Sequence, residues 1–169
     1  MTVADRIGVM DNGRLEQVAT PRLLYEAPRS RWVAGFVGDV NLFEGQVEAR
    51  EAGRVLIATG DAGTITVTEP RDPVKAKAIS VAIRPEKVRL SRRGPASDAA
   101  NSPAINRLEG VVSEVSYLGG LTAYKVKLDT GAVVHSSLAN TVRLDVDAYQ
   151  AGQRVVAWFT PDDCVVLEQ

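Results

Sequence analysis

The sequence EGVVSEVSYLGGLTAYKVKL, residues 109–128, contains the clearest strand pattern in this chain. Its first nine residues mix valine and tyrosine with serine and glutamate, which is typical of a half-buried strand. Gly119 and Gly120 then permit the positive φ that a tight turn demands, and the chain returns through residues 121–128. In the returning strand the lysines occupy one face, while tyrosine, valine and leucine occupy the other. The stretch therefore predicts an antiparallel hairpin.

Short strand-like runs flank this hairpin on both sides. They are separated by turn signals, and helical periodicity is almost absent after residue 40. Residues 69–77 and 91–103 have the composition of loops. The pattern predicts a mainly β chain that forms a small antiparallel barrel or sandwich. The further predicted strands are residues 42–49, 55–57, 64–67, 79–83, 133–136, 154–159 and 165–167.

The first 40 residues follow a different plan. Residues 6–19 read as a strand, a turn that can reach positive φ at residues 11–13, and a returning strand. Two short helices follow over residues 20–25 and 30–37, each begun by a residue that can cap it, a threonine and a serine respectively.

Aromatic residues mark one side of the second helix. Trp32 and Phe36 are four residues apart and therefore share a face, with Val33 beside them. We expect this face to be buried against something, either a core or an interface.

Two similar motifs occur 65 residues apart. Residues 41–47 and 106–112 both follow the pattern Asn-x-x-Glu-Gly-x-Val. They could begin two related barrel segments, or the match could be chance; the sequence alone leaves both interpretations open.

Composition excludes several classes of function. The chain has 20 basic and 21 acidic residues and 5% aromatics, so it lacks the basic, aromatic groove of an OB-type nucleic-acid binder. One cysteine, Cys164, and one histidine, His135, cannot supply a metal cluster or a disulfide. No apolar run approaches the length of about 20 residues that spans a bilayer. We expect a soluble, cytosolic protein without metal or nucleic acid.

No ATPase motif is present in the sequence. ATP hydrolysis by an ABC ATPase requires a glycine-rich phosphate loop with a lysine and a hydroxylic residue, together with a signature motif and a switch histidine. The sequence contains none of these. We therefore expect this chain alone to be no enzyme and to hold no cofactor.

Two parts of the sequence nevertheless resemble one known family. Residues 5–21 resemble the end of the ATPase domain in ABC importers that carry a C-terminal extension, and residues 41–167 resemble that extension, the TOBE domain. The resemblance implies an OB-like barrel, residues 41–169, preceded by a remnant of the ATPase domain, residues 1–40. It is greatest to the importers of spermidine and putrescine. The motif and interface candidates are Arg84, Pro85, Glu86, Tyr117, Gly119, Gly120, Asn140, Trp32 and Phe36.

The resemblance also implies a regulatory and assembly role with particular partners. In the family two ATPase subunits face each other and their barrels touch, so a second copy of the chain is one expected partner. The permease subunits are another, through the ATPase domain, and ATP and Mg²⁺ belong to the full-length parent. The complex lies at the inner face of the cell membrane. Without the ATPase domain, the apolar edge of residues 6–19 and the Trp32 face predict a homodimer that could exchange its N-terminal segments.

A hypothesis from another class is a stand-alone ligand-sensing module for a small oxyanion or a polyamine. Related barrels bind small anions through backbone N–H groups and hydroxylic side chains at subunit interfaces. The candidate residues for this role are Ser113, Ser116, Ser136 and Ser137.

Overall fold

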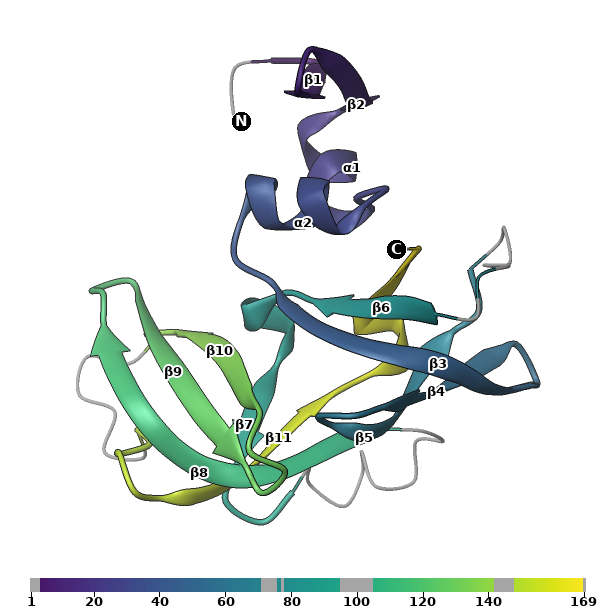
Figure 1. The fold of residues 1–169 in the computed structure, drawn as a ribbon. Coiled ribbons are helices and arrows are strands. Elements are labelled where there is room, and N and C mark those ends of the chain that lie inside the picture. Colours follow the sequence, from purple (N-terminus) through teal and green to yellow (C-terminus); the bar gives the residue numbers. More distant parts are fainter. Residues whose placement is uncertain (1–3, 71–75, 77, 95–104, 142–147, 169) are drawn as a thin grey trace.

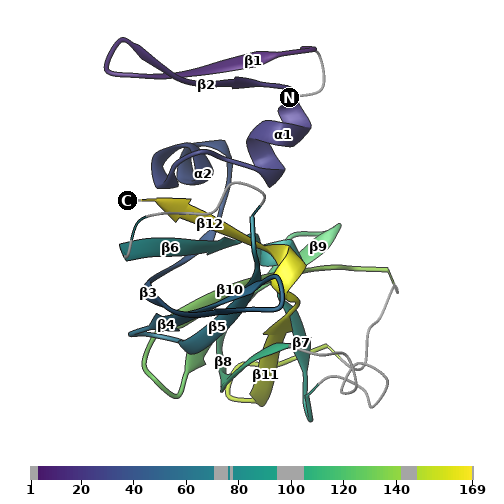
Figure 2. The same cartoon turned by 90° about the vertical axis from the view of Figure 1, so that its right-hand side faces the viewer.

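A computed structural model describes residues 1–169 except 1–3, 71–75, 77, 95–104, 142–147 and 169. The described chain is arranged in tiers, with an N-terminal hairpin, a pair of short helices and then a barrel (Figures 1 and 2). The fold is mainly β with two helices, which confirms the predicted class.

The N-terminal tiers have the predicted elements. Strands β1 (Ile7–Asp11) and β2 (Arg14–Ala19) form a separate two-stranded antiparallel sheet. Helix α1 (Pro21–Glu26) is capped by the Thr20 hydroxyl, and helix α2 (Arg31–Val37) is capped by the Ser30 hydroxyl. A small core of valines and leucine joins the hairpin to both helices; its buried members are Val9, Leu24 and Val33.

The barrel consists of two five-stranded antiparallel sheets. We call the first lobe 1; its strand order is β12-β6-β3-β4-β5. We call the second lobe 2; its order is β10-β9-β8-β11-β7. The bounds are β3 Asn41–Glu51, β4 Arg54–Thr59, β5 Gly63–Thr68, β6 Ala78–Ile83, β7 Arg89–Ser91, β8 Asn106–Tyr117, β9 Leu121–Leu128, β10 Val133–Ala139, β11 Arg154–Phe159 and β12 Cys164–Glu168.

All the strands predicted from the sequence are present, and three short elements were missed. These are β7 and the 3₁₀ turns η1 (Pro85–Lys87) and η2 (Pro161–Asp163). Each is only three residues long, too short for a periodic pattern to show. The predicted end of the strand over residues 79–83 is confirmed, because β6 ends at Ile83 and Pro85 begins η1.

The two lobes repeat one plan, which answers the question left open by the Asn-x-x-Glu-Gly-x-Val motifs. Asn41 begins β3 opposite Ile83 of β6, and Asn106 begins β8 opposite Phe159 of β11. Both hairpins carry a bulge at the same place, after Val47 and after Val112. Each lobe takes its fifth strand from the other half of the sequence. After β6, η1 leads into β7 of lobe 2, and after β11, η2 leads into β12 of lobe 1. The motifs therefore begin two equivalent lobes.

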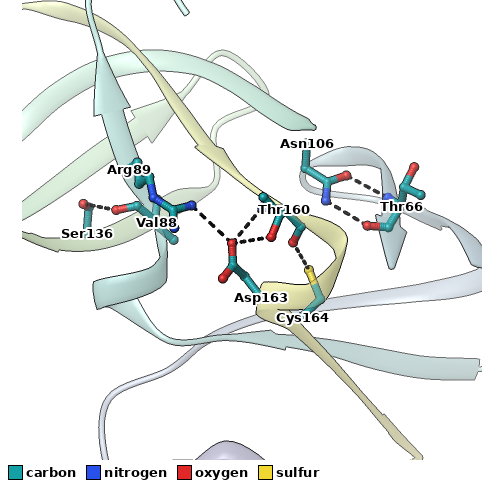
Figure 3. Close-up of polar contacts among 8 residues, drawn as sticks. All are labelled: Thr66, Val88, Arg89, Asn106, Ser136, Thr160, Asp163 and Cys164. Carbon is teal, nitrogen blue, oxygen red and sulfur yellow. Dashed lines mark hydrogen bonds and ion pairs between the residues drawn. The ribbon is translucent and has the colours of Figure 1, made fainter. Parts of the chain in front are cut away.

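The asparagine of each motif joins the two lobes by capping an edge strand of the other one. The Asn106 amide donates to Thr66 O and accepts from Thr66 N, both at 2.8 Å, on β5 (Figure 3). The Asn41 amide does the same on β10, accepting from His135 N at 2.7 Å and donating to His135 O at 2.9 Å. Both asparagines are buried, so these contacts replace the backbone pairing that an edge strand lacks.

The glycine of each motif is required by close packing of its hairpin. A Cβ on Gly45 would lie 2.6 Å from Ala58 O, and one on Gly110 would lie 2.4 Å from Lys127 O. Both distances are shorter than any real contact of a Cβ atom. The long strands β3 and β8 can therefore bend over their neighbours only at a residue without a side chain.

Candidate functional site

The helical segment, residues 20–40, docks on the outer face of lobe 1. Ala34 of α2 is fully buried against Ala82 of β6 and Leu167 of β12. Partly buried aliphatic side chains surround this contact, namely Val40, Leu42 and Val165. The docking surface is small and apolar, so a polar group has to fix the orientation of the helical segment on lobe 1.

Arg84 is that polar group. Its side chain is 94% buried and donates five hydrogen bonds, all to main-chain carbonyl oxygens of the helical segment. Nε and Nη2 share Tyr25 O at 3.3 and 3.0 Å. Nη1 donates to three further carbonyls, those of Ala34, Gly38 and Asp39, at 2.9–3.0 Å.

The position of these carbonyls explains how a buried cation is tolerated without a carboxylate. Tyr25 lies in the last turn of α1, and Ala34 and Gly38 lie in the last turn and C-cap of α2. The last carbonyls of a helix lack intrahelical partners and carry its partial negative charge. One guanidinium therefore satisfies the ends of both helices at once, and the planar fork of arginine suits this role better than a lysine ammonium.

Tyr25 and Glu86 lie on either side of Arg84. Together with Arg84 they form the contact between the helical segment and lobe 1, which we call the junction. The Arg84 guanidinium lies 4.1 Å from the centroid of the Tyr25 ring, and the Tyr25 hydroxyl donates to Glu86 Oε1 at 2.7 Å. Burial, followed by the hydrogen bond to Glu86, raises the pKa of Tyr25 to about 12. Lys87 lies 3.8 Å from Glu26, which adds a long ion pair at the rim. A cavity of about 50 Å³ remains between the two parts.

The equivalent face of lobe 2 is built differently. In lobe 1 the cross-strand row is Val165, Ala82 and Leu42; in lobe 2 the same row is Arg89, Trp158 and Arg107. Arg89 lies over the Trp158 ring at 4.9 Å. Its guanidinium also reaches Asp163 at 3.3 Å (Figure 3). The residue equivalent to Arg84 is Thr160, whose N–H and hydroxyl bond to Asp163 within η2. Lobe 2 therefore offers neither the apolar surface nor the guanidinium that dock the helices.

A second candidate region is the hairpin tip, residues 117–121 between β8 and β9. Asn140 fixes it, because its amide donates to Gly119 O at 2.7 Å and accepts from the Thr122 hydroxyl at 2.7 Å. The Asn140 N–H also donates to Gly120 O. The predicted positive φ is found at Gly119, where φ is 78°. The exposed fractions are 74% for Tyr117 and 65% for Leu118.

The third candidate region, Trp32 and Phe36, is not covered by the described chain. The two rings stack with centroids 5.0 Å apart, as their spacing predicts, and they are 38% and 68% exposed. The expectation that Val33 shares this face was wrong. Val33 is fully buried on the other side of α2, against Val9 and Leu24, because the hairpin β1–β2 covers that side.

The predicted candidates thus fall into three places rather than one. The structure brings Arg84, Pro85 and Glu86 together at the junction, and Tyr117, Gly119, Gly120 and Asn140 at the hairpin tip. Tyr25 was missed by sequence reasoning, because its role depends on a residue 59 positions away.

The contacts of several other residues considered from the sequence are also defined. Ser136 is buried and its hydroxyl donates to Val88 O (Figure 3), while the exposed Ser113 donates to Lys125 O, so each of these two hydroxyls bonds to the main chain of lobe 2 or its neighbouring segment. Burial, together with Asp163, raises the pKa of Cys164, which keeps its thiol protonated. Within the described residues no group of three or more His, Cys, Asp or Glu side chains could hold a metal ion.

Comparison with known proteins places these features in context. Residues 81–167 match the TOBE domain. The whole chain is 35% identical over 171 residues to the spermidine/putrescine import ATP-binding protein PotA of Trichormus variabilis, covering 42% of that protein. It is 35% identical over 168 residues, 99% of this chain and 43% of the other, to the putrescine transport ATP-binding protein PotG of Escherichia coli. The PotA of Acidothermus cellulolyticus is 39% identical over 165 residues, which are 96% of this chain and 40% of that protein.

The chain therefore spans less than half the length of the relatives it matches. Among solved structures, the cytoplasmic molybdate-binding protein ModG is similar with a TM-score of 0.59 and 16% identity, over 75% of this chain and 94% of that one. This similarity concerns the fold alone. Among the described residues, no helix is long and apolar enough to cross a membrane.

Proposed function

The chain belongs to the TOBE domain family, and on that premise we propose that it is the C-terminal regulatory part of the ATP-binding subunit of an ABC importer for polyamines. Its work is assembly and regulation of ATP-driven uptake. The ATP-hydrolysing machinery belongs to the parent subunit, which works with permease subunits at the inner face of the cell membrane.

The observation that carries this proposal is the Arg84 junction. The similarity to the importer subunits extends over the whole chain, including the hairpin and the helical segment that precede the TOBE match. Arg84 fastens the helical segment to lobe 1 through five hydrogen bonds, so a displacement of either part displaces the other. Such a rigid joint is what a regulatory barrel needs to act on a neighbouring ATPase domain.

The uncovered surfaces favour a dimeric assembly. Lobe 1 joins β3 to β4 with two residues between Glu51 and Arg54, whereas lobe 2 has six residues between the equivalent Ser116 and Ala123. Lobe 2 therefore has four residues more, and they lengthen the apolar hairpin tip, residues 117–121, that Asn140 fixes. An exposed apolar surface that is also rigid suits contact with another protein. We assign it to a second copy of the barrel.

Uptake measurements test the importer role. In cells whose importer contains this chain within its ATP-binding subunit, we expect Arg84→Met to alter uptake of labelled putrescine or spermidine at an unchanged level of subunit. The control Arg154→Met removes an exposed arginine of lobe 2 and should leave uptake unchanged. Sulfate and sugars serve as control solutes. Polyamine uptake that is independent of the subunit containing this chain would overturn the proposal.

Light scattering tests the dimer. At tens of micromolar we expect the mass of a dimer, and a Tyr117→Ser/Leu118→Ser variant should shift the equilibrium to monomer. Ala52→Ser, at the tip of the lobe 1 hairpin, is the matched control. A monomeric wild-type chain would refute dimerisation, whereas a dimer unaffected by the tip variant would refute only the surface assigned to it.

A further inference from the structure

The outer face of lobe 2 shows how this fold holds a guanidinium group. Arg154, at the start of β11, lies between Glu109 of β8 and Asp129 at the end of β9. Nη2 lies 3.0 Å from Glu109 Oε2 and 2.5 Å from Asp129 Oδ2, and Nη1 lies 3.1 Å from Asp129 Oδ1. The hydrogen bonds to Asp129 and Glu109 raise the pKa of Arg154.

The same place in lobe 1 is an open groove of about 370 Å³. By the strand registers, Glu44 is equivalent to Glu109, Ala78 to Arg154 and Gly60 to Asp129. The anionic residue is therefore kept, while the arginine is replaced by a residue that ends at Cβ. The groove is lined by Glu44, Gly45, Gln46, Ala58, Gly60 and Ala78.

Two further observations concern the surroundings of Glu44. Arg31 of α2 donates to Glu44 Oε1 at 2.7 Å, so a guanidinium from the helical segment already uses one oxygen of this carboxylate. Ser80 lies directly opposite Glu44 in the β3–β6 ladder. Its hydroxyl is fully buried and has no hydrogen-bond partner among the described residues. Glu44 thus pairs with one guanidinium of the helical segment while its side chain stays 60% exposed at the groove.

We propose that this groove binds the guanidinium or primary ammonium head of an organic cation, with Glu44 as its anion. The N–H groups donate to Glu44 as Arg154 donates to Glu109, and the alkyl part lies over Ala58 and Ala78. Because Arg31 uses the same carboxylate, the bound cation competes with the ion pair between α2 and lobe 1. The cation can be a free small molecule or the side chain of a partner protein.

Amide chemical shifts of the isotope-labelled 169-residue chain test this inference. We expect n-butylguanidinium and n-butylammonium to produce saturable shifts around Glu44, Gln46 and Gly60, whereas tetramethylammonium, which has no N–H donor, produces none. Glu44→Gln should weaken binding about tenfold, because it removes a charge-assisted hydrogen bond. Glu109→Gln, the equivalent change in lobe 2, should leave the affinity unchanged.

Two variants of lobe 1 sharpen the test. Arg31→Ala removes the competing cation and should tighten binding about threefold, in keeping with the small strength of an exposed ion pair. Ala78→Arg places an arginine where lobe 2 has one and should abolish binding without lowering the melting temperature. N-acetylarginine N-methylamide, an arginine with blocked main-chain groups, distinguishes a partner side chain from a free small cation. Binding as tight as that of n-butylguanidinium points to a partner side chain, and no binding points to a free cation.

Three results would overturn the inference. These are the absence of saturable shifts with either amine or guanidinium, equal affinity in the Glu44→Gln variant, and undiminished binding in Ala78→Arg.

Discussion

Lobe 1 and lobe 2 share one ladder of strands and differ on the face that looks outward. Inside, both begin with a buried asparagine and both bend at a glycine that nothing larger could replace. Outside, lobe 1 presents Ala82 in the middle of an aliphatic row, and lobe 2 presents Trp158 between two arginines. The comparison shows that inward positions maintain the barrel while outward positions decide what each lobe contacts.

This difference explains why lobe 1, and not lobe 2, docks the helices. Small apolar residues let α2 approach lobe 1 closely enough for Arg84 to reach the helix ends. The bulky and charged row of lobe 2 excludes a helix at the equivalent place. The exposed apolar residues of lobe 2 lie instead at its longer hairpin tip.

Arg84→Met should have the largest effect. Hydrogen bonds to a charged group contribute about 1.5–3 kcal/mol each, so losing this group should destabilise the docking of residues 20–40 by about 3 kcal/mol or more. Hydrogen exchange should rise in α1 and α2 while the core strand β9 stays protected. Arg154→Met, on the exposed face of lobe 2, should cost at most about 1 kcal/mol. Equal effects of the two variants would contradict the asymmetry of the lobes.

Ala82→Trp transfers the lobe 2 residue to the docking face of lobe 1. The indole has no room beside Ala34 and Leu167, and overpacking typically costs about 1–3 kcal/mol. We expect α2 to become accessible to protease while the barrel remains folded. The reverse change, Trp158→Ala, should leave α2 protected. Protection of α2 in both variants would mean that the outer row does not decide docking.

Asn41→Ala and Asn106→Ala test the equivalence of the inner positions. Each removes paired, buried hydrogen bonds to an edge strand of the other lobe, and we expect a loss of about 1–3 kcal/mol in each case. Chemical denaturation measures both values. Losses that differ by more than about 2 kcal/mol would contradict the equivalence of the two lobes.

Tyr25→Phe should have the smallest effect: at neutral pH it removes only the partly exposed hydrogen bond to Glu86, and the difference from the wild-type chain should disappear as the pH rises to about 12. The pKa of Tyr25 is raised to about 12, so between pH 10 and 12 the unfolded chain loses this proton while the folded chain keeps it. Stability therefore falls as pH rises through this window. The Phe variant lacks this contribution, and its denaturation midpoint should fall less steeply above pH 10. Parallel curves for the two proteins would refute the role of the hydroxyl.

Much of this architecture was readable from the sequence, because alternation of side chains is a local property. The hairpin over residues 109–128 and the capped helices were predicted with their boundaries nearly correct. The Tyr-Leu-Gly-Gly turn and Asn140 were singled out by resemblance, and their contact is found. Val33 was placed on the wrong side of α2, because a seven-residue helix shows apolar faces without saying which one the hairpin covers.

Local patterns in the sequence are enough to predict the strands, the turns, the near-neutral charge and the two motifs from which the lobes begin. It took the folded protein to show that the lobes exchange their fifth strands, that one of them docks the helices, and that Arg84 joins carbonyls 45 to 59 residues away. The reason is physical. A residue's inward or outward direction follows from its immediate neighbours in the chain, whereas the partner of a buried charge depends on which distant segments the fold brings together.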